Sequence, residues 1–216
     1  MSGLGLTFLR RGNLAHPTAG LPYIRFADAE VERICIENFS KDGIGVIPED
    51  VENLTDIGNI FAENKLITSF DEFVYFKSVK VLNNHRFYGC ENLKSINLDN
   101  IVETKRAASN GALGACKSLT ELSFPNVVTI GGWVCEQCTS LTKVDIGPYC
   151  TSIAWGSFRN CPITTFIVRA LTPPTLSDST LTTSTNIYVP DEVVDAYKTA
   201  WSSRAAKIFP LSSYTE

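Results

Sequence analysis

Apolar and polar residues recur along the middle of the chain in a repeated pattern, apolar-x-x-apolar-x-apolar. The last two apolar residues of each copy alternate with polar ones, which is typical of a β-strand with one buried face. Four copies are present, with the alternating pairs Ile96/Leu98, Leu122/Phe124, Val144/Ile146 and Phe166/Val168. The pattern predicts one parallel ribbon built from residues 93–98, 119–124, 141–146 and 163–168.

A cysteine precedes each of these predicted strands at a matching position. Spacings of 26, 22 and 23 residues separate Cys90, Cys116, Cys138 and Cys161, and the longer first spacing predicts an extra loop near residues 104–111. A unit this small cannot bury its apolar face alone, so stacked neighbours are expected to share one core. Because cysteine packs as a small hydrophobe, we expect the four thiols to be reduced and to form a buried ladder. The chain has seven cysteines, an odd number, so a complete set of intramolecular disulfides is impossible.

These repeats resemble the BspA-like, treponemal-type leucine-rich repeat. The resemblance rests on Cys-x-x-Leu-x-x-Ile-x-Leu followed by Val-x-x-Ile-Gly-x-x-Ala-Phe-x-x-Cys, and Val127–Gly131 matches it best. It implies an α+β repeat fold, a right-handed leucine-rich-repeat solenoid with a parallel β ribbon, over residues 66–176. Residues 24–35, 67–73 and 187–198 resemble the flanking segments of such proteins in gut bacteria and their phages. Members of this family are usually surface adhesion or host-interaction proteins, which is the function that the resemblance implies.

The segments on either side of the repeats carry helical patterns, as expected where the open ends of a solenoid need covering. Apolar residues follow helical spacing in residues 27–38 and again in residues 48–63. At the other end, Pro190 and the acidic residues after it favour a helix over residues 191–201. The predicted organisation is an extended N-terminal arm (1–25), a helical N-terminal cap (26–65), the repeats (66–176), and a C-terminal strand and capping helix (177–216).

Three short motifs are similar to ligand-binding motifs, and a structural role is favoured for each. Cys135-Glu-Gln-Cys138 is a CxxC, but Cys138 is a ladder cysteine and Cys135 occupies the column of Phe87 and Phe158. No second CxxC exists, the only histidines are His16 and His85, and a zinc site needs four matched ligands. The run 111–118 nearly spells a phosphate-binding loop, except that Cys116 stands where the second glycine must be. The run 40–51 lacks three ligands of a calcium loop. We therefore expect no metal and no cofactor.

Charge and composition exclude further classes of function. No Ser/His/Asp set can be assembled, and the paired carboxylates lie at predicted helix starts, so we expect no enzyme activity. A net charge of −4 argues against a nucleic-acid partner. No apolar run is long enough for a bilayer, so membrane insertion is not expected. The arginines near the N-terminus follow a short apolar stretch instead of preceding it, so no signal peptide is predicted.

The surface residues that remain define a candidate ligand site. The turns after the second short strand of each repeat contain His85, Arg106, Asn110, Trp133 and Trp155. Exposed aromatic residues beside polar groups suit protein or glycan contact. Two alternatives stay open: the tryptophans fold down over the edge, or binding uses the outward ribbon columns 95–121–143–165 and 97–123–145–167, which have mixed charge and no aromatic anchor.

The sequence therefore predicts a non-enzymatic recognition module for a protein or glycan, acting in adhesion or host interaction. The alternative is a structural spacer or phage virion component anchored by the N-terminal arm. By resemblance the protein is at the cell surface, secreted or virion-associated. The ligand, the compartment and the oligomeric state stay open.

Overall fold

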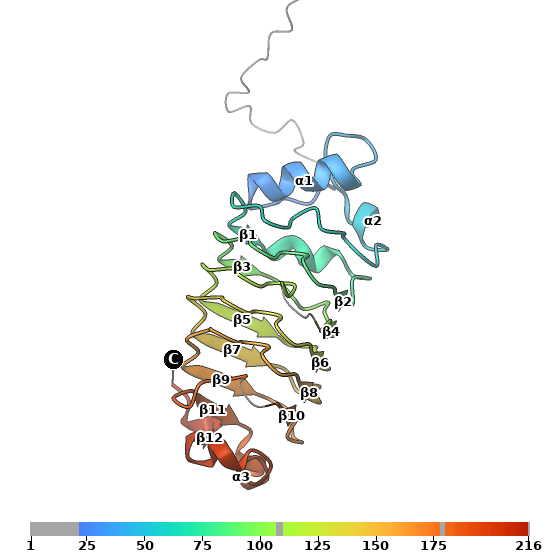
Figure 1. Cartoon of the computed structure of the whole chain (residues 1–216). Coiled ribbons are helices and arrows are strands. Elements are labelled where there is room, and N and C mark those ends of the chain that lie inside the picture. The colour runs from blue at the N-terminus through green and yellow to red at the C-terminus, as the bar shows by residue number, and fades with distance from the viewer. Residues whose placement is uncertain (1–21, 107–109, 178–179, 216) are drawn as a thin grey trace, which may run out of the picture.

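The computed structural model describes residues 22–106, 110–177 and 180–215. These residues form an elongated stack of repeats, with helices α1 and α2 at one end and α3 at the other (Figure 1). The predicted arm lies outside the described residues up to position 21. The right-handed winding of the stack stays a prediction. No helix in the described part of the chain is long and apolar enough to span a bilayer.

The longest strands form one five-stranded parallel sheet, which we call the main ribbon. Its order is β5 (Glu121–Phe124), β7 (Lys143–Ile146), β9 (Thr165–Val168), β11 (Asn186–Val189) and β12 (Ile208–Pro210). Leu122 pairs with Val144 and Val144 with Phe166, so equivalent residues of successive repeats are in register. The predicted alternation is confirmed, since these side chains are buried while residues 121 and 123 are exposed.

A second parallel sheet runs along the stack beside the main ribbon (Figure 1). Its strands are β2 (Val81–Leu82), β4 (Glu103–Thr104), β6 (Thr129–Ile130), β8 (Ser152–Ile153) and β10 (Thr175–Leu176). Each strand has two residues, of which the second faces the interior in β2, β4, β6 and β8. The polypeptide turns sharply after each of these strands, and those turns contain the candidate site residues.

The prediction of a single ribbon of four segments is wrong for its first member. The strand β3 (Ser95–Ile96) pairs with β1 (Ser69–Phe70) in a separate two-stranded sheet. The Lys94 N–H donates to the Thr68 carbonyl oxygen (2.8 Å), on the β1 side. Within the described ranges no backbone hydrogen bond joins β3 to β5. The interruption concerns the main ribbon alone, because β4 of the same repeat pairs with both β2 and β6 in the second sheet.

The cysteine ladder is buried, as predicted, and its thiols are hydrogen-bonded. All seven cysteines are free and buried. Each ladder thiol donates to a carbonyl oxygen of the preceding repeat, from Cys90 to Phe61, Cys116 to Phe87, Cys138 to Leu113 and Cys161 to Cys135, over 2.9–3.1 Å. Each of these oxygens also accepts the backbone N–H three residues further on, so a cysteine at this position fills the core and adds a second bond to a turn carbonyl of the preceding repeat.

The first predicted helix is confirmed as α1 (Ala29–Phe39), which buries Val31, Ile34 and Cys35. It begins after Asp28, whose carboxylate accepts the N–H groups of Glu30 and Val31 and so satisfies backbone donors of the first turn. The other Asp28 oxygen accepts from the Thr68 N–H and hydroxyl, both at 2.7 Å, which ties the start of α1 to the repeats.

The second predicted helix, over residues 48–63, is wrong beyond its first turn, α2 (Pro48–Val51). Gly58 and Glu63 have φ of 63° and 58°, values that end any right-handed helix. In a later repeat, Gly156 and Asn160 have φ of 69° and 60° in the same order. The segment therefore folds as a repeat, and Phe61 stacks on Phe87, its equivalent in the next repeat, at 5.5 Å. The apolar spacing of repeat turns imitates helical spacing over this short length.

The C-terminal segment packs against the last repeats. A short 3₁₀ turn (Asp191–Val193) leads into α3 (Val194–Ala200), and further 3₁₀ turns at Ser202–Lys207 and Leu211–Ser213 flank β12. Tyr197 and Trp201 are buried in edge-to-face contact at 4.9 Å. The Tyr197 hydroxyl donates to the Ala170 carbonyl oxygen and the Trp201 indole N–H to that of Pro174. The polar ends of both rings thus bond to the turn after β9.

Candidate functional site

We call the turns that follow β2, β4, β6 and β8, as far as the structure describes them, the turn edge. Three residues after these strands, or six in the long repeat, the backbone enters the left-handed region at His85, Asn110, Trp133 and Gly156, with φ of 66°, 55°, 65° and 69°. The recurring φ shows that these positions are structurally equivalent. Trp155 therefore lies one position before the column that contains Trp133.

Trp133 has a backbone conformation that bulky residues rarely adopt, because the left-handed region brings the Cβ atom close to the following carbonyl oxygen. The indole lies over the next repeat, since a Cβ atom on Gly156 would be 3.1 Å from Trp133 ring atoms. Trp133 is partly buried as a result. Residues held in such conformations at a surface concentrate at functional sites, where surrounding structure offsets the strain.

Trp155 is the exposed member of the aromatic pair, with 43% of its surface accessible. Its ring meets that of Trp133 at 4.4 Å between centroids and 63° between planes. The Arg159 guanidinium lies 6.0 Å from the Trp155 ring and forms an ion pair with Glu136 at 3.6 Å. The sequence interpretation did not include Arg159 or Glu136, although Arg159 follows Trp155 by four residues within the same turn.

The Arg106 side chain lies close to Gly132, the residue that precedes Trp133. A Cβ atom on Gly132 would be 2.8 Å from the Trp155 carbonyl oxygen and 3.6 Å from the Arg106 side chain. The absence of a side chain at position 132 thus lets the chain pack closely between these two residues. The Arg106 carbonyl oxygen accepts from the Asn84 amide at 3.3 Å, which connects the loop to the preceding repeat.

His85 and Asn110 share the column of Trp133 but are not brought into contact with the aromatic pair. His85 is partly buried, and its ring lies 5.7 Å from that of Tyr88. Asn110 is partly buried and follows residues 107–109 of the extra loop, which lie outside the described residues. The structure therefore groups Arg106, Trp133 and Trp155, with Arg159 added, and places the other two predicted residues further along the edge.

The ribbon face, meaning the outward side of the main ribbon, is the competing surface. Its charges are paired across strands: Lys143 with Glu121 at 3.5 Å, and Arg169 with both oxygens of Asp145 at 2.7–2.8 Å. The Asp145 carboxylate raises the pKa of Arg169. A hollow of about 400 Å³ lies on this face over β3, β5 and β7.

The two predicted columns contain no aromatic residue, but the ribbon continues beyond them and has aromatic residues on its C-terminal half. Tyr188 on β11 lies 5.9 Å from Phe209 on β12 and 5.0 Å from Tyr214, and Lys143 lies 5.6 Å from the Tyr214 ring. The outward residue Ile167 beside them is only 1% exposed, yet it does not belong to the main core cluster. The segment 211–214 therefore covers this half of the face. The predicted columns ended at β9 because residues 186–189 were assigned to the C-terminal cap and residues 208–210 were not recognised as a strand.

The CxxC and the calcium-like run make contacts within the chain. Cys135 and Cys138 are fully buried, and in the described part of the chain no group of three His, Cys, Asp or Glu residues is arranged to hold a metal. Asp42 of the calcium-like run accepts the N–H groups of Ile44 and Gly45, and the Tyr23 hydroxyl donates to it. These bonds keep the pKa of Asp42 well below its usual range.

The comparison with family models agrees with the repeat architecture. A family model described as the BspA type leucine rich repeat region, in 6 copies, matches residues 52–194. The search of curated proteins found no match. A solved structure of a leucine rich cell surface protein from Faecalibacterium prausnitzii A2-165 is 15% identical with a TM-score of 0.37. The match covers 69% of this chain and 38% of that one.

Proposed function

The chain belongs to the BspA-type leucine-rich-repeat family, and we propose that it is a non-enzymatic recognition module that binds a protein or glycan through its turn edge. The observation that carries this proposal is the Trp133–Trp155 pair. Trp155 is 43% exposed, and Trp133 is held in a left-handed backbone conformation that costs free energy for a bulky residue. Interface hot spots are enriched in tryptophan and arginine, and Arg106 and Arg159 flank the pair.

The biological role that follows is adhesion or host interaction at a cell surface, in secreted form or on a virion. A leucine-rich-repeat stack suits such a role because it presents equivalent positions of successive repeats in register along an extended surface. The turn edge is favoured over the ribbon face because the ribbon residues already have partners within the chain. The ribbon charges are paired with each other, and segment 211–214 covers its aromatic residues.

The proposal is tested by screening the purified full chain on a glycan array and in a pull-down with candidate partner proteins. For any ligand found, we expect Trp155→Ala and Trp133→Ala each to weaken binding by about 2 kcal/mol or more, the cost typical of a hot spot. Tyr149→Ala is a matched control, because Tyr149 is exposed (60%) but lies outside the turn edge.

Glu121→Ala on the ribbon face is the opposing variant. If Glu121→Ala abolishes binding while the folded tryptophan variants retain it, the ribbon is the site and the proposal is wrong. No ligand in either screen would instead favour a spacer or virion component.

A further inference from the structure

Acidic residues are concentrated in the N-terminal part of the described chain. Residues 22–80 contain six basic and twelve acidic residues, a net charge of −6, whereas residues 81–216 contain eleven of each. An excess of one sign of charge raises the local concentration of ligands of the opposite sign. The first repeats therefore attract cations, and the rest of the stack has no net preference.

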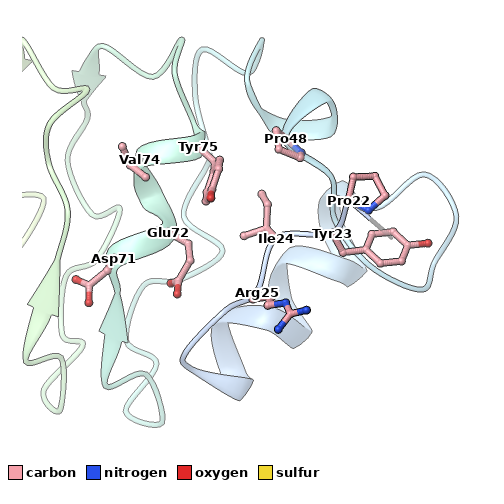
Figure 2. Close-up of a pocket in the computed structure, with 9 residues that line it drawn as sticks. All are labelled: Pro22, Tyr23, Ile24, Arg25, Pro48, Asp71, Glu72, Val74 and Tyr75. Carbon is pink, nitrogen blue, oxygen red and sulfur yellow. The ribbon is translucent and has the colours of Figure 1, made fainter. Parts of the chain in front are cut away.

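An open cavity of about 520 Å³ lies within this acidic part (Figure 2). Its walls come from the segment that precedes α1, the start of α2 and the 3₁₀ turn η1 (Asp71–Tyr75). Figure 2 shows Tyr75 and Glu72 projecting from η1 towards the side on which Ile24 and Arg25 lie. Three segments that are distant in sequence thus enclose one space at the end of the stack opposite to α3.

The cavity contains the carboxylates of two residues adjacent in sequence, Asp71 and Glu72, which differ in their hydrogen-bond partners. One oxygen of Glu72 accepts the Ala27 N–H at 2.9 Å. The other oxygen is shielded from solvent and has no hydrogen-bond partner within the described ranges. Asp71 is exposed and accepts from the Ser95 hydroxyl at 3.1 Å. A shielded carboxylate oxygen without a donor is costly, so a rotation of the Glu72 side chain that brings this oxygen to a donor of a ligand is favoured.

The remaining walls suit a hydrocarbon stem beside a cationic head. Pro48, Ile24 and Val74 supply apolar surface, and the 38% exposed ring of Tyr75 stands next to the carboxylates. Lysine and arginine bury their methylene groups on apolar surface while the charged end meets polar groups. An aromatic ring face also attracts a cation.

We infer that this cavity is a second binding site, separate from the turn edge, which takes the lysine or arginine side chain of a partner peptide. Glu72 and Asp71 bind the cationic head, Tyr75 stacks on it, and the apolar walls hold the stem. Arg25 occupies the rim and has no ion-pair partner in the described chain. Its charge opposes the ligand, and its removal is therefore expected to strengthen binding.

The probe is the blocked pentapeptide Gly-Ser-Arg-Ser-Gly, with its lysine and citrulline versions, titrated into the ¹⁵N-labelled full chain at low salt. We expect the arginine and lysine peptides to shift the amide signals of residues 71–75. The citrulline peptide has nearly the same shape without the charge and should bind about tenfold more weakly. Equal binding of the arginine and citrulline peptides would contradict the inference.

Matched variants separate the cavity from the general acidic field. Glu72→Gln keeps the shape and is expected to weaken the arginine peptide about tenfold. Glu49→Gln removes the same charge from a residue that is exposed beside Pro48 but does not line the cavity, and should change binding less than about twofold. Arg25→Gln should strengthen binding about twofold. If Glu72→Gln does not fold, Asp71→Asn and Tyr75→Ala provide the same test on residues that are already exposed.

Equal losses of peptide affinity in the Glu72 and Glu49 variants would mean that the peptide responds only to the general negative charge of this region. The cavity would then not be a binding site. The proposals for the turn edge and for the cavity fail independently. Trp155→Ala should leave the peptide titration unchanged, and Glu72→Gln should leave unchanged the binding of any ligand of the turn edge.

Discussion

The turn edge and the ribbon face are built by the same repeats, but their outward side chains have different partners. On the ribbon, extended strands bring charges of neighbouring repeats together, so Lys143, Glu121, Asp145 and Arg169 are paired. On the edge, left-handed turns interrupt regular pairing, and Trp155 stays exposed beside Trp133. The comparison teaches that both surfaces pair their charges, since Arg159 pairs with Glu136 and Arg86 with Asp56 on the edge, but that only the edge leaves an aromatic ring exposed for a ligand, at Trp155.

The turn edge and the ribbon face are taken to cover one closed core. The reactivity of the core thiols tests this, and it is the measurement for which we expect the largest effect. Burial raises the pKa of Cys90 to about 12. At pH 8 its thiolate, the reactive form, should be about a thousandfold rarer than in an unfolded chain. The measurement is the rate of modification by an aromatic disulfide reagent in the native protein and in urea. Native rates within about tenfold of the unfolded rates would show an open core.

The same shift predicts how stability changes in alkali. The Cys90 pKa is raised above its ordinary value of 9.0, so burial favours the neutral thiol. The stability that this contributes is complete below pH 9 and is lost as the pH rises towards 12. Urea unfolding at increasing pH should show the midpoint falling over this range, and less so in Cys90→Ala.

The next largest effect is expected at Gly156, where the turn edge depends on an absent side chain. Gly156→Ala places a Cβ atom 3.1 Å from the Trp133 ring at a φ of 69°, and should destabilise the fold by about 2 kcal/mol. Gly58→Ala is the matched control, since φ is 63° in the same column but nothing lies within 4 Å. It should cost about 1 kcal/mol. Equal costs in urea unfolding would mean that Trp133 does not pack on Gly156.

On the ribbon face, Tyr214→Ala should uncover Ile167 and Tyr188. We expect a loss of about 1.5 kcal/mol from the uncovered apolar surface and the lost ring contact, measured by thermal unfolding, together with increased binding of a hydrophobic dye. Tyr149→Ala, at an exposed tyrosine, should change neither reading. An unchanged dye signal in Tyr214→Ala would mean that segment 211–214 does not shield the ribbon.

The smallest effect concerns backbone strain at Trp133. Glycine normally destabilises relative to alanine, but at a φ of 65° the order should reverse. Trp133→Gly is expected to be more stable than Trp133→Ala by about 1 kcal/mol, while both lose the aromatic contact. Chemical unfolding of the two variants measures the difference. An alanine variant as stable as the glycine variant would remove the evidence that this turn stores strain.

Much of the fold could be predicted from the sequence because the same pattern of apolar residues occurs in several repeats. The alternation at residues 122–124, 144–146 and 166–168 located strands, and the ladder cysteines located buried positions. The helix over 48–63 was wrong because apolar spacing does not report φ. Gly58 and Glu63 could have indicated a further repeat only by alignment with Gly156 and Asn160.

The candidate site was accessible in part. The positions of Trp133 and Trp155 in adjacent columns followed from the repeat, and so did their place in the turns. Their contact with each other, the approach of Arg106 to Gly132 and the position of Arg159 depend on how consecutive turns stack. The same holds for Tyr214 on the ribbon face and for the cavity between residues 22–25 and 71–75.

The sequence by itself determined which residues of a repeat are buried, because burial follows a local period that each unit repeats. Only the tertiary structure decided which exposed residues meet, because that depends on distances between repeats and on the placement of the non-repeating ends. Function in a repeat protein depends on these contacts between exposed residues. The core could therefore be predicted from the sequence, whereas the binding surfaces could be described only from the tertiary structure.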